Sequence, residues 1–178
     1  MLTLFDSLLT SLSRTKAIII DLRTNGGGHG GVELAGRFAR EKVLTHYKAI
    51  KQKGDYETFK PLEPHYLVPN DGVRYAKPVV ILTNDKTASS AEDFVISLHQ
   101  QPTVTTIGTN TSGTLSDMFE ASLSNNIVFT LSNQRYYTTD NQLLEDVGVP
   151  VEIEIENSKQ DIQNKIDPLI IRAIEVLK

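Results

Sequence analysis

Short apolar runs that alternate with amphipathic segments dominate the hydrophobic pattern of this chain. Residues 17–22 and 77–83 are continuous apolar runs rich in β-branched side chains, which is typical of parallel strands buried on both faces. A turn follows each run, and apolar residues then recur at helical spacing over 32–42 and 91–99. This repeated order of strand, turn and helix predicts an α/β fold with a parallel sheet.

The rest of the chain predicts further elements around that sheet. Asp167 followed by Pro168 predicts the beginning of a closing helix that runs through Leu177, because proline is favoured at the first helical position. Four more segments have the apolar and β-branched composition of strands: 103–108, 127–132, 135–139 and 151–155.

Two segments give weaker signals. Leucines at helical spacing between Leu4 and Leu12 predict an N-terminal helix, which suggests that the sequence begins in the middle of a longer parent protein. Residues 45–76 show no sustained period and predict a long excursion with at most short strands. Since 178 residues is an ordinary length for one domain, we expect residues 1–178 to form a single domain.

Composition narrows the classes of function. A formal net charge of −4 leaves no excess of Lys and Arg to neutralise a phosphate backbone, so nucleic acid is not an expected partner. The chain has no Cys and only four scattered His, and it gives no metal signal. No apolar run approaches the roughly 18 residues of a membrane span. We therefore expect no metal, no cofactor and no membrane span.

A glycine-rich turn, residues 26–31, follows the first predicted strand and formally satisfies the dinucleotide fingerprint G-x-G-x-x-G. Polar residues separate the strand from the first glycine, and no acidic residue follows at the expected distance at the end of a second strand, which disfavours nucleotide binding. Two other interpretations stay open. The glycines could permit a tight turn with positive φ, or they could direct backbone N–H groups at an anion.

A second motif, residues 87–92, lies between the second apolar run and its helix. Ser89 and Glu92 have the spacing of a capping box, in which each side chain bonds the backbone N–H of the other residue. The same position also exposes a hydroxyl at a helix N-terminus, where developing negative charge is favoured. Both interpretations predict the same local shape. There is no G-x-S-x-G elbow, so an ordinary α/β-hydrolase is not indicated.

Taken together, these motifs resemble the C-terminal processing, or tail-specific, serine protease family. The shared motifs are D-L-R-x-N-x-G-G over 21–28, T-A-S-x-A-E over 87–92, Thr111-x-Gly113, and E-x-x-G-V over 145–149. The resemblance covers about residues 16–178. It implies a fold similar to the core of crotonase and Clp protease, which is built of repeated β-β-α units.

The resemblance also implies a set of roles. Ser89 corresponds to the nucleophile of a serine-type endopeptidase that hydrolyses polypeptide or protein-tail substrates through an acyl-enzyme. The backbone N–H of Ser90 and an N–H from Gly27 or Gly28 correspond to the oxyanion hole, and Glu145 corresponds to a carboxylate of the catalytic network. By family analogy the protein is exported or belongs to the bacterial cell envelope, although the sequence shows no signal peptide.

The general base is the part of the pattern that this sequence does not supply. The bacterial and chloroplast branch of the family uses a Lys at the position of Thr114, and no Lys lies between Lys86 and Lys159. The tricorn-like branch, which includes the retinoid-binding repeats, instead uses an upstream His together with a Glu that matches Glu145. His29 has no catalytic counterpart in the family. We therefore expect a tricorn-like core whose base lies upstream and which is inactive alone.

Two alternatives stay open beside the peptidase. The same fold could serve as a non-catalytic module that binds a small apolar ligand or a peptide, and retention of Ser89 and Glu145 argues against that alternative. An acyl-CoA enzyme of the crotonase group would share the fold without needing the Ser89 motif. Binding of coenzyme A would distinguish that class from the other two.

Overall fold

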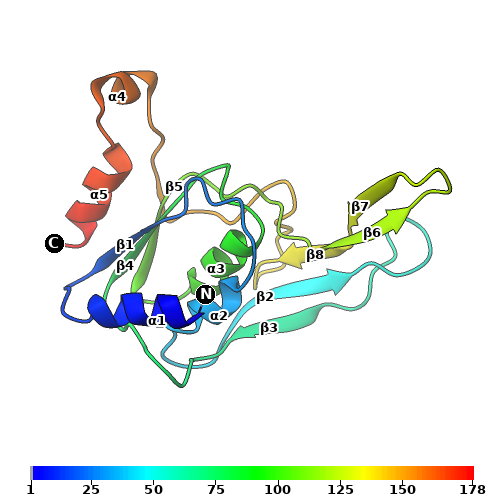
Figure 1. Cartoon of the computed structure of the whole chain (residues 1–178), viewed down its shortest axis with the longest axis horizontal. Coiled ribbons are helices and arrows are strands. Elements are labelled where there is room, and N and C mark those ends of the chain that lie inside the picture. Colours follow the sequence, from blue (N-terminus) through cyan, green and yellow to red (C-terminus); the bar gives the residue numbers. More distant parts are fainter. Residues whose placement is uncertain (1) are drawn as a thin grey trace.

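The computed structural model describes residues 2–178 and contains a four-stranded parallel sheet (Figure 1). Pairing of Ile18 with Val79, and of Val79 with Val104, aligns the first three strands. The predicted α/β class is confirmed. In spatial order the strands are β1 (Ile18–Asp21), β4 (Val79–Thr83), β5 (Val104–Gly108) and β9 (Ile153–Glu154).

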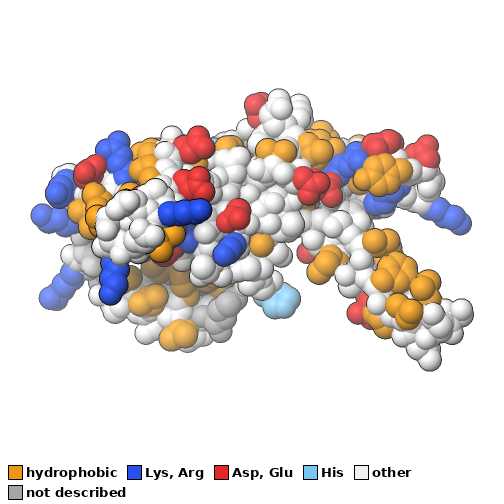
Figure 2. Space-filling view, turned by 90° about the horizontal axis from the view of Figure 1, so that it is seen from above, with side chains coloured by type: hydrophobic (Ala, Val, Ile, Leu, Met, Phe, Trp, Pro, Cys, Tyr) orange, Lys and Arg blue, Asp and Glu red, His pale blue; other side chains and the backbone are white. Residues whose placement is uncertain are grey.

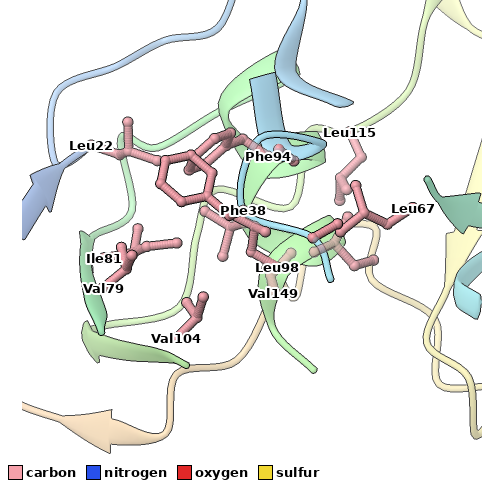
Figure 3. Close-up of a cluster of buried hydrophobic side chains, with 14 of the residues drawn as sticks. Leu22, Phe38, Leu67, Val79, Ile81, Phe94, Leu98, Val104, Leu115 and Val149 are labelled. Carbon is pink, nitrogen blue, oxygen red and sulfur yellow. The ribbon is translucent and has the colours of Figure 1, made fainter. Parts of the chain in front are cut away.

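Helices cover the sheet on both faces because its central strand β4 is buried along its whole length and is apolar from Val79 to Leu82. All five residues of β4 are buried. Val79 and Ile81 belong to one hydrophobic cluster with Phe94 and Leu98 of α3, drawn in Figure 3. The alternate residues of β4 belong to a second cluster with α5. The helices are α1 (Leu2–Ser11), α2 (Gly31–Ala35), α3 (Ser90–Leu98), α4 (Lys159–Asn164) and α5 (Pro168–Val176).

The beginning of α5 agrees with the sequence signal. The carboxylate of Asp167 accepts hydrogen bonds from the backbone N–H groups of Leu169 and Ile170, both at 3.2 Å, and Pro168 occupies the first turn. The helix α2 is shorter than predicted, because it ends at Ala35 and turns follow. Among the described residues, no helix is both long and apolar enough to cross a membrane.

Antiparallel strands form the remainder of the molecule, on the right in Figure 1. The predicted excursion over 45–76 contains two strands that pair with each other, and the expectation of at most short strands is wrong for the eight residues of β2. The inward side chains of β2 include the polar residues Thr45 and His46, so hydrophobic periodicity does not mark it. One sheet is β3 (Glu63–Leu67), β2 (Val43–Ile50) and β8 (Gln134–Tyr137), and a hairpin is β6 (Met118–Ser122) with β7 (Val128–Ser132).

The parallel arrangement determines where a site can form. Because β1, β4 and β5 run in the same direction and in register, the turns that follow them meet at one edge of the sheet. These turns are residues 22–30, 84–89 and 109–114. Ligands of open parallel sheets bind beyond the carboxyl ends of the strands, and the candidate residue Ser89 lies at this edge.

Candidate active site

Ser89 lies at the turn between β4 and α3 in a backbone conformation that is rare for a residue with a side chain. Its φ is 54° and its ψ is −125°, and it is the N-cap residue of α3. Non-glycine residues seldom adopt positive φ, and such strain is found where a side chain must be presented in a defined direction. The turn therefore exposes the half-buried Ser89 side chain at the N-terminus of a helix.

The buried carboxylate of Glu92 holds this turn in place through hydrogen bonds. Glu92 is fully buried and accepts a hydrogen bond from the backbone N–H of Ser89 at 2.9 Å, which is one half of the predicted capping box. It also accepts from the Thr111 hydroxyl at 2.6 Å and from the N–H groups of Gly113 at 2.7 Å and Thr114 at 3.0 Å. Sequence reasoning missed this link between the serine turn and residues 111–114. The Thr111-x-Gly113 motif was the available signal.

The glycine turn passes directly against the serine. A Cβ atom on Gly27 would lie 2.7 Å from the Ser89 Cβ, 2.7 Å from the carbonyl oxygen of Ala88 and 3.1 Å from the backbone nitrogen of Ser90. Gly27 also has a φ of +99°. Only glycine allows so close an approach with this backbone geometry. Of the interpretations left open by the sequence, the tight turn with positive φ is confirmed.

Two backbone donors remain open at this contact. The N–H of Gly27 donates to the side-chain oxygen of Asn25 at 3.0 Å, and the Ser90 hydroxyl accepts from the N–H of Gly31 at 3.0 Å. Within residues 2–178, the backbone N–H groups of Gly28 and Ser90 donate no hydrogen bond. Each of these two donors belongs to the residue that comes directly after one of the contacting residues, Gly27 and Ser89.

A pocket of about 290 Å³ opens at Ser89. Its lining includes Ser89, Gly26, Thr114, Tyr136 and Glu145, so the structure brings two residues singled out in the sequence, Ser89 and Glu145, into one pocket. The Glu145 side chain is 39% exposed and lies 4.0 Å from the Arg135 guanidinium. Glu145 is therefore within reach of solvent and of any group that enters the pocket.

No histidine or lysine lines this pocket in the described part of the chain. His29 lines a separate cavity that also includes Ser89, whereas His46 and His65 stack on each other in the antiparallel sheet at a ring distance of 5.0 Å. Burial lowers the pKa of His46 to about 3. Burial also lowers the pKa of His99. Across residues 2–178, no cluster of three or more potential ligands could hold a metal ion.

A second buried carboxylate, Asp93, lies next to Glu92 and was not singled out from the sequence. Its Oδ1 atom is buried without a hydrogen-bond partner among the described residues. Burial raises the pKa of Asp93 to about 6, and the negative charges of Asp117, Glu92 and Glu33 act in the same direction, while Lys48 opposes them. Asp93 shares a cavity with Ser89 on the side of the glycine turn. Only the position directly after Glu92 could have drawn attention to it.

The charged residues at the end of β1 have a structural role. Arg23 forms two hydrogen bonds with Asp21, at 2.9 and 2.7 Å, and a third with Asp167 at 2.7 Å. This network connects the end of β1 to the N-terminus of α5. Hydrogen bonds to Arg23 lower the pKa of Asp21. These residues therefore hold the fold around the site and do not face the pocket of Ser89.

The chain is similar in sequence and structure to known peptidases. The sequence model of Peptidase family S41 matches residues 3–155. Comparison with curated protein sequences gives no match. Among solved structures, a predicted peptidase from Parabacteroides merdae ATCC 43184 is similar over 97% of this chain and 55% of its own, with 30% identity and a TM-score of 0.87.

Two further structures are similar to the same region. Tricorn protease matches 91% of this chain and 15% of its own, with 25% identity and a TM-score of 0.66. The photosystem II D1 C-terminal processing protease matches 85% of this chain and 38% of its own, with 21% identity and a TM-score of 0.64, which is a likeness of fold. The chain spans about half the length of the Parabacteroides protein and a smaller share of the other two.

Proposed function

The chain belongs to peptidase family S41, and we propose that it carries the nucleophile and the oxyanion hole of a serine endopeptidase that acts on polypeptides. The observation that carries this proposal is the strained turn at Ser89, with φ of 54°, placed against a glycine turn that leaves two N–H donors open. A capping role alone requires neither the strain at Ser89 nor a glycine turn in contact with it.

The chemistry follows from these positions. The Ser89 Oγ atom forms a bond to the carbonyl carbon of the substrate, and its proton passes to an acceptor. The carbonyl oxygen becomes an oxyanion that the N–H groups of Ser90 and Gly28 stabilise, a contribution of about 3 kcal/mol for a single donor. The C–N bond then breaks, the amine leaves with the proton, and water hydrolyses the resulting ester. In this proposal Gly28 is the donor, because the N–H of Gly27 is bonded to Asn25.

The proton acceptor is the part of the mechanism that the described residues do not supply. The pocket with Ser89 offers the carboxylates of Glu145 and Asp146, and no His or Lys. This fits the tricorn-like arrangement, in which a histidine from an upstream segment takes the proton and the carboxylate supports it. We propose that Glu145 has this supporting role and that the chain alone reacts slowly.

The lack of a His or Lys among the described residues that line the pocket with Ser89 favours one alternative function. A pocket without a base suits a non-catalytic module that binds a peptide or an apolar ligand on the same fold. The two functions differ in the reactivity of Ser89, because a serine without an activating network is a weak nucleophile.

Labelling with a fluorophosphonate tests the proposal. We would treat this chain, and the longest gene product that contains it, with the probe and measure intact masses. We expect one adduct, with the longer protein labelled faster, and a loss of at least about 100-fold in rate in Ser89→Ala. Ser122→Ala, which changes an exposed serine of β6, serves as the matched control. Absence of labelling in both proteins would favour the binding module.

A further inference from the structure

Arg135 of β8 lies next to the pocket of Ser89 but does not line it. Its two neighbours in the strand, Gln134 and Tyr136, both line the pocket. Because successive side chains of a strand point to opposite faces, the Arg135 side chain leaves β8 on the other face. The peptidase chemistry described above gives this arginine no role.

The register of strand pairing places Arg135 opposite Glu145. Tyr137 forms an antiparallel bridge with Leu143, and a backbone hydrogen bond of 2.9 Å joins the next pair in this register. One further step pairs Arg135 with Glu145. Opposite charges at facing positions of antiparallel segments attract. The Arg135 Nε atom accordingly lies 4.0 Å from the Glu145 Oε2 atom.

Three side chains from the segment between β2 and β3 hold the guanidinium of Arg135 in place. Its Nη1 and Nη2 atoms donate to the two carboxylate oxygens of Glu57, at 2.9 and 3.5 Å. Its Cζ atom lies 4.2 Å from the ring centre of Phe59 and 5.7 Å from that of Tyr56, which are cation–π distances. A guanidinium has five N–H groups, so this attachment leaves the Nε–H group for Glu145.

The Glu145 side chain has no other group to fix its direction. Within residues 2–178, its carboxylate accepts no hydrogen bond and contacts no cation except Arg135. A long side chain without a partner samples several rotamers, and ordering it costs conformational entropy. An ion pair at this exposure adds little to stability. Its effect on direction matters more, because a carboxylate that supports a catalytic base must be oriented by its neighbours.

We propose that Arg135 is a positioning residue that orients the carboxylate of Glu145 at the pocket of Ser89, and that Glu57 holds Arg135 from the opposite side. This inference rests on the proposed peptidase function and deepens it. Since Arg135 does not line the pocket, it acts on the reaction only through Glu145. The segment between β2 and β3 is thereby connected to the site.

A double-mutant cycle tests this route. We would measure the rate of fluorophosphonate labelling in the longest gene product that contains this chain. We expect Arg135→Gln to lower the rate by about 10- to 100-fold, since misplacement by about 1 Å has effects of this size. In a Glu145→Gln background, Arg135→Gln should cause no further loss, because residues that act through one another are not additive. Arg172→Gln, which breaks an exposed ion pair of α5, is the matched control and should label like the wild type.

Additive losses would overturn the inference, because an arginine that only supports the fold lowers the rate in both backgrounds. If Arg135→Gln does not fold, Glu57→Gln replaces it in the cycle, since the Glu57 side chain is 68% exposed. We expect Glu57→Gln to lower the rate by about threefold, as for the loss of an exposed ion pair, and to have no effect once Glu145 is Gln. An equal loss in both backgrounds would again contradict the proposal.

A spectroscopic measurement separates this inference from the peptidase proposal. If the wild type is not labelled, the peptidase proposal fails, and the side-chain carboxyl ¹³C signal of Glu145 decides on the arrangement. The signal is assigned by its loss in Glu145→Gln. We expect it to shift in Arg135→Gln and also in Glu57→Gln, whose effect must pass through Arg135. A signal that stays in place in both variants would show that Arg135 does not orient Glu145.

Discussion

The two loops that meet at Ser89 are held in different ways. Residues 111–114 are fixed by hydrogen bonds to one buried carboxylate, that of Glu92. The glycine turn, residues 22–30, has no such centre. It is held by contacts of its main chain, such as the hydrogen bond from the N–H of Ala88 to the carbonyl oxygen of Asn25 at 3.0 Å and the close approach of Gly27.

This difference shows how one strained turn can be both fixed and accessible. A fully satisfied buried charge makes the 111–114 side rigid, because moving any of these donors away loses a hydrogen bond to a charged group in a medium of low dielectric. The glycine turn is held by close packing of its main chain, so the N–H groups of Gly28 and Ser90 stay free for a substrate. The carboxylate on that side, Asp93, is correspondingly left without a partner for its Oδ1 atom.

Removing the carboxylate of Glu92 should have the largest effect. Glu92→Ala leaves the hydroxyl of Thr111 and the N–H groups of Ser89, Gly113 and Thr114 without an acceptor. We expect a loss of about 3–5 kcal/mol in the free energy of unfolding, measured by urea denaturation, together with the loss of fluorophosphonate labelling.

Two variants make the Glu92 test specific. Glu92→Gln keeps the shape and one acceptor, and we expect it to fall between the wild type and Glu92→Ala in both measurements. Glu120→Ala, at an exposed position of β6, controls for the loss of a negative charge. If Glu92→Ala unfolds at the same urea concentration as Glu120→Ala, the buried carboxylate is not what holds residues 111–114.

On the glycine side, Gly27→Ala should break the close contact with the serine. The added Cβ would lie 2.7 Å from the Ser89 Cβ, and a φ of +99° is unfavourable for alanine. We expect a loss of about 2–3 kcal/mol in the free energy of unfolding and slower labelling of Ser89. For the free energy of unfolding, Gly28→Ala is the matched control, because it has a positive φ but no atom within 4 Å of its added Cβ. Equal losses in the two variants would show that strain alone, not the contact with Ser89, explains the effect.

The parallel sheet could be predicted because its signal is local. A strand buried on both faces, such as β4 over Val79–Thr83, is apolar at nearly every position, so its composition alone identifies it. The helix after it, α3, has apolar residues at helical spacing. Ser89 follows from the same reasoning, since it is the last residue before that helix. The sequence of strand, turn and helix thus positions the candidate nucleophile without any long-range information.

The antiparallel part could not be predicted in the same way. Strand β2 places polar residues inward, and its His46 stacks between His65 and Tyr136 at ring distances of 5.0 and 5.5 Å. In the hairpin of β6 and β7, apolar side chains such as Met118 and Leu131 are exposed, which Figure 2 shows as hydrophobic side chains along a projecting arm. Neither pattern alternates in the way that a half-buried strand does.

The sequence predicts which residues form the candidate site, but not the contacts and hydrogen bonds between them. The shared pocket of Ser89 and Glu145, which are distant in sequence, depends on the packing of β6, β7, β8 and the loops beside them. The hydrogen bonds of Glu92 and the missing partner of Asp93 depend on the same packing. Two neighbouring carboxylates on one helix look alike in the sequence, and only their surroundings make one satisfied and the other not.

The smallest expected effect, and one of opposite sign, concerns Asp93. Its pKa is raised by burial from an ordinary value of 3.8 to about 6 in the folded protein. Between these two values the folded state binds more protons than the unfolded state, so this group makes the protein less stable as the pH rises through that window. At pH 7.5 the cost is fully present, and it vanishes as the pH falls below 3.8.

Asp93→Asn removes the charge and keeps the size of the side chain, so we expect it to stabilise the protein at pH 7.5 by about 1–2 kcal/mol. Thermal unfolding of the variant and the wild type, measured from pH 7.5 down to pH 4, should show the difference shrinking toward zero. Asp71→Asn, at an exposed aspartate, should show no such dependence. A destabilised Asp93→Asn at pH 7.5 would mean that the carboxylate has a partner in solution, and that the glycine side of the serine is held by charge after all.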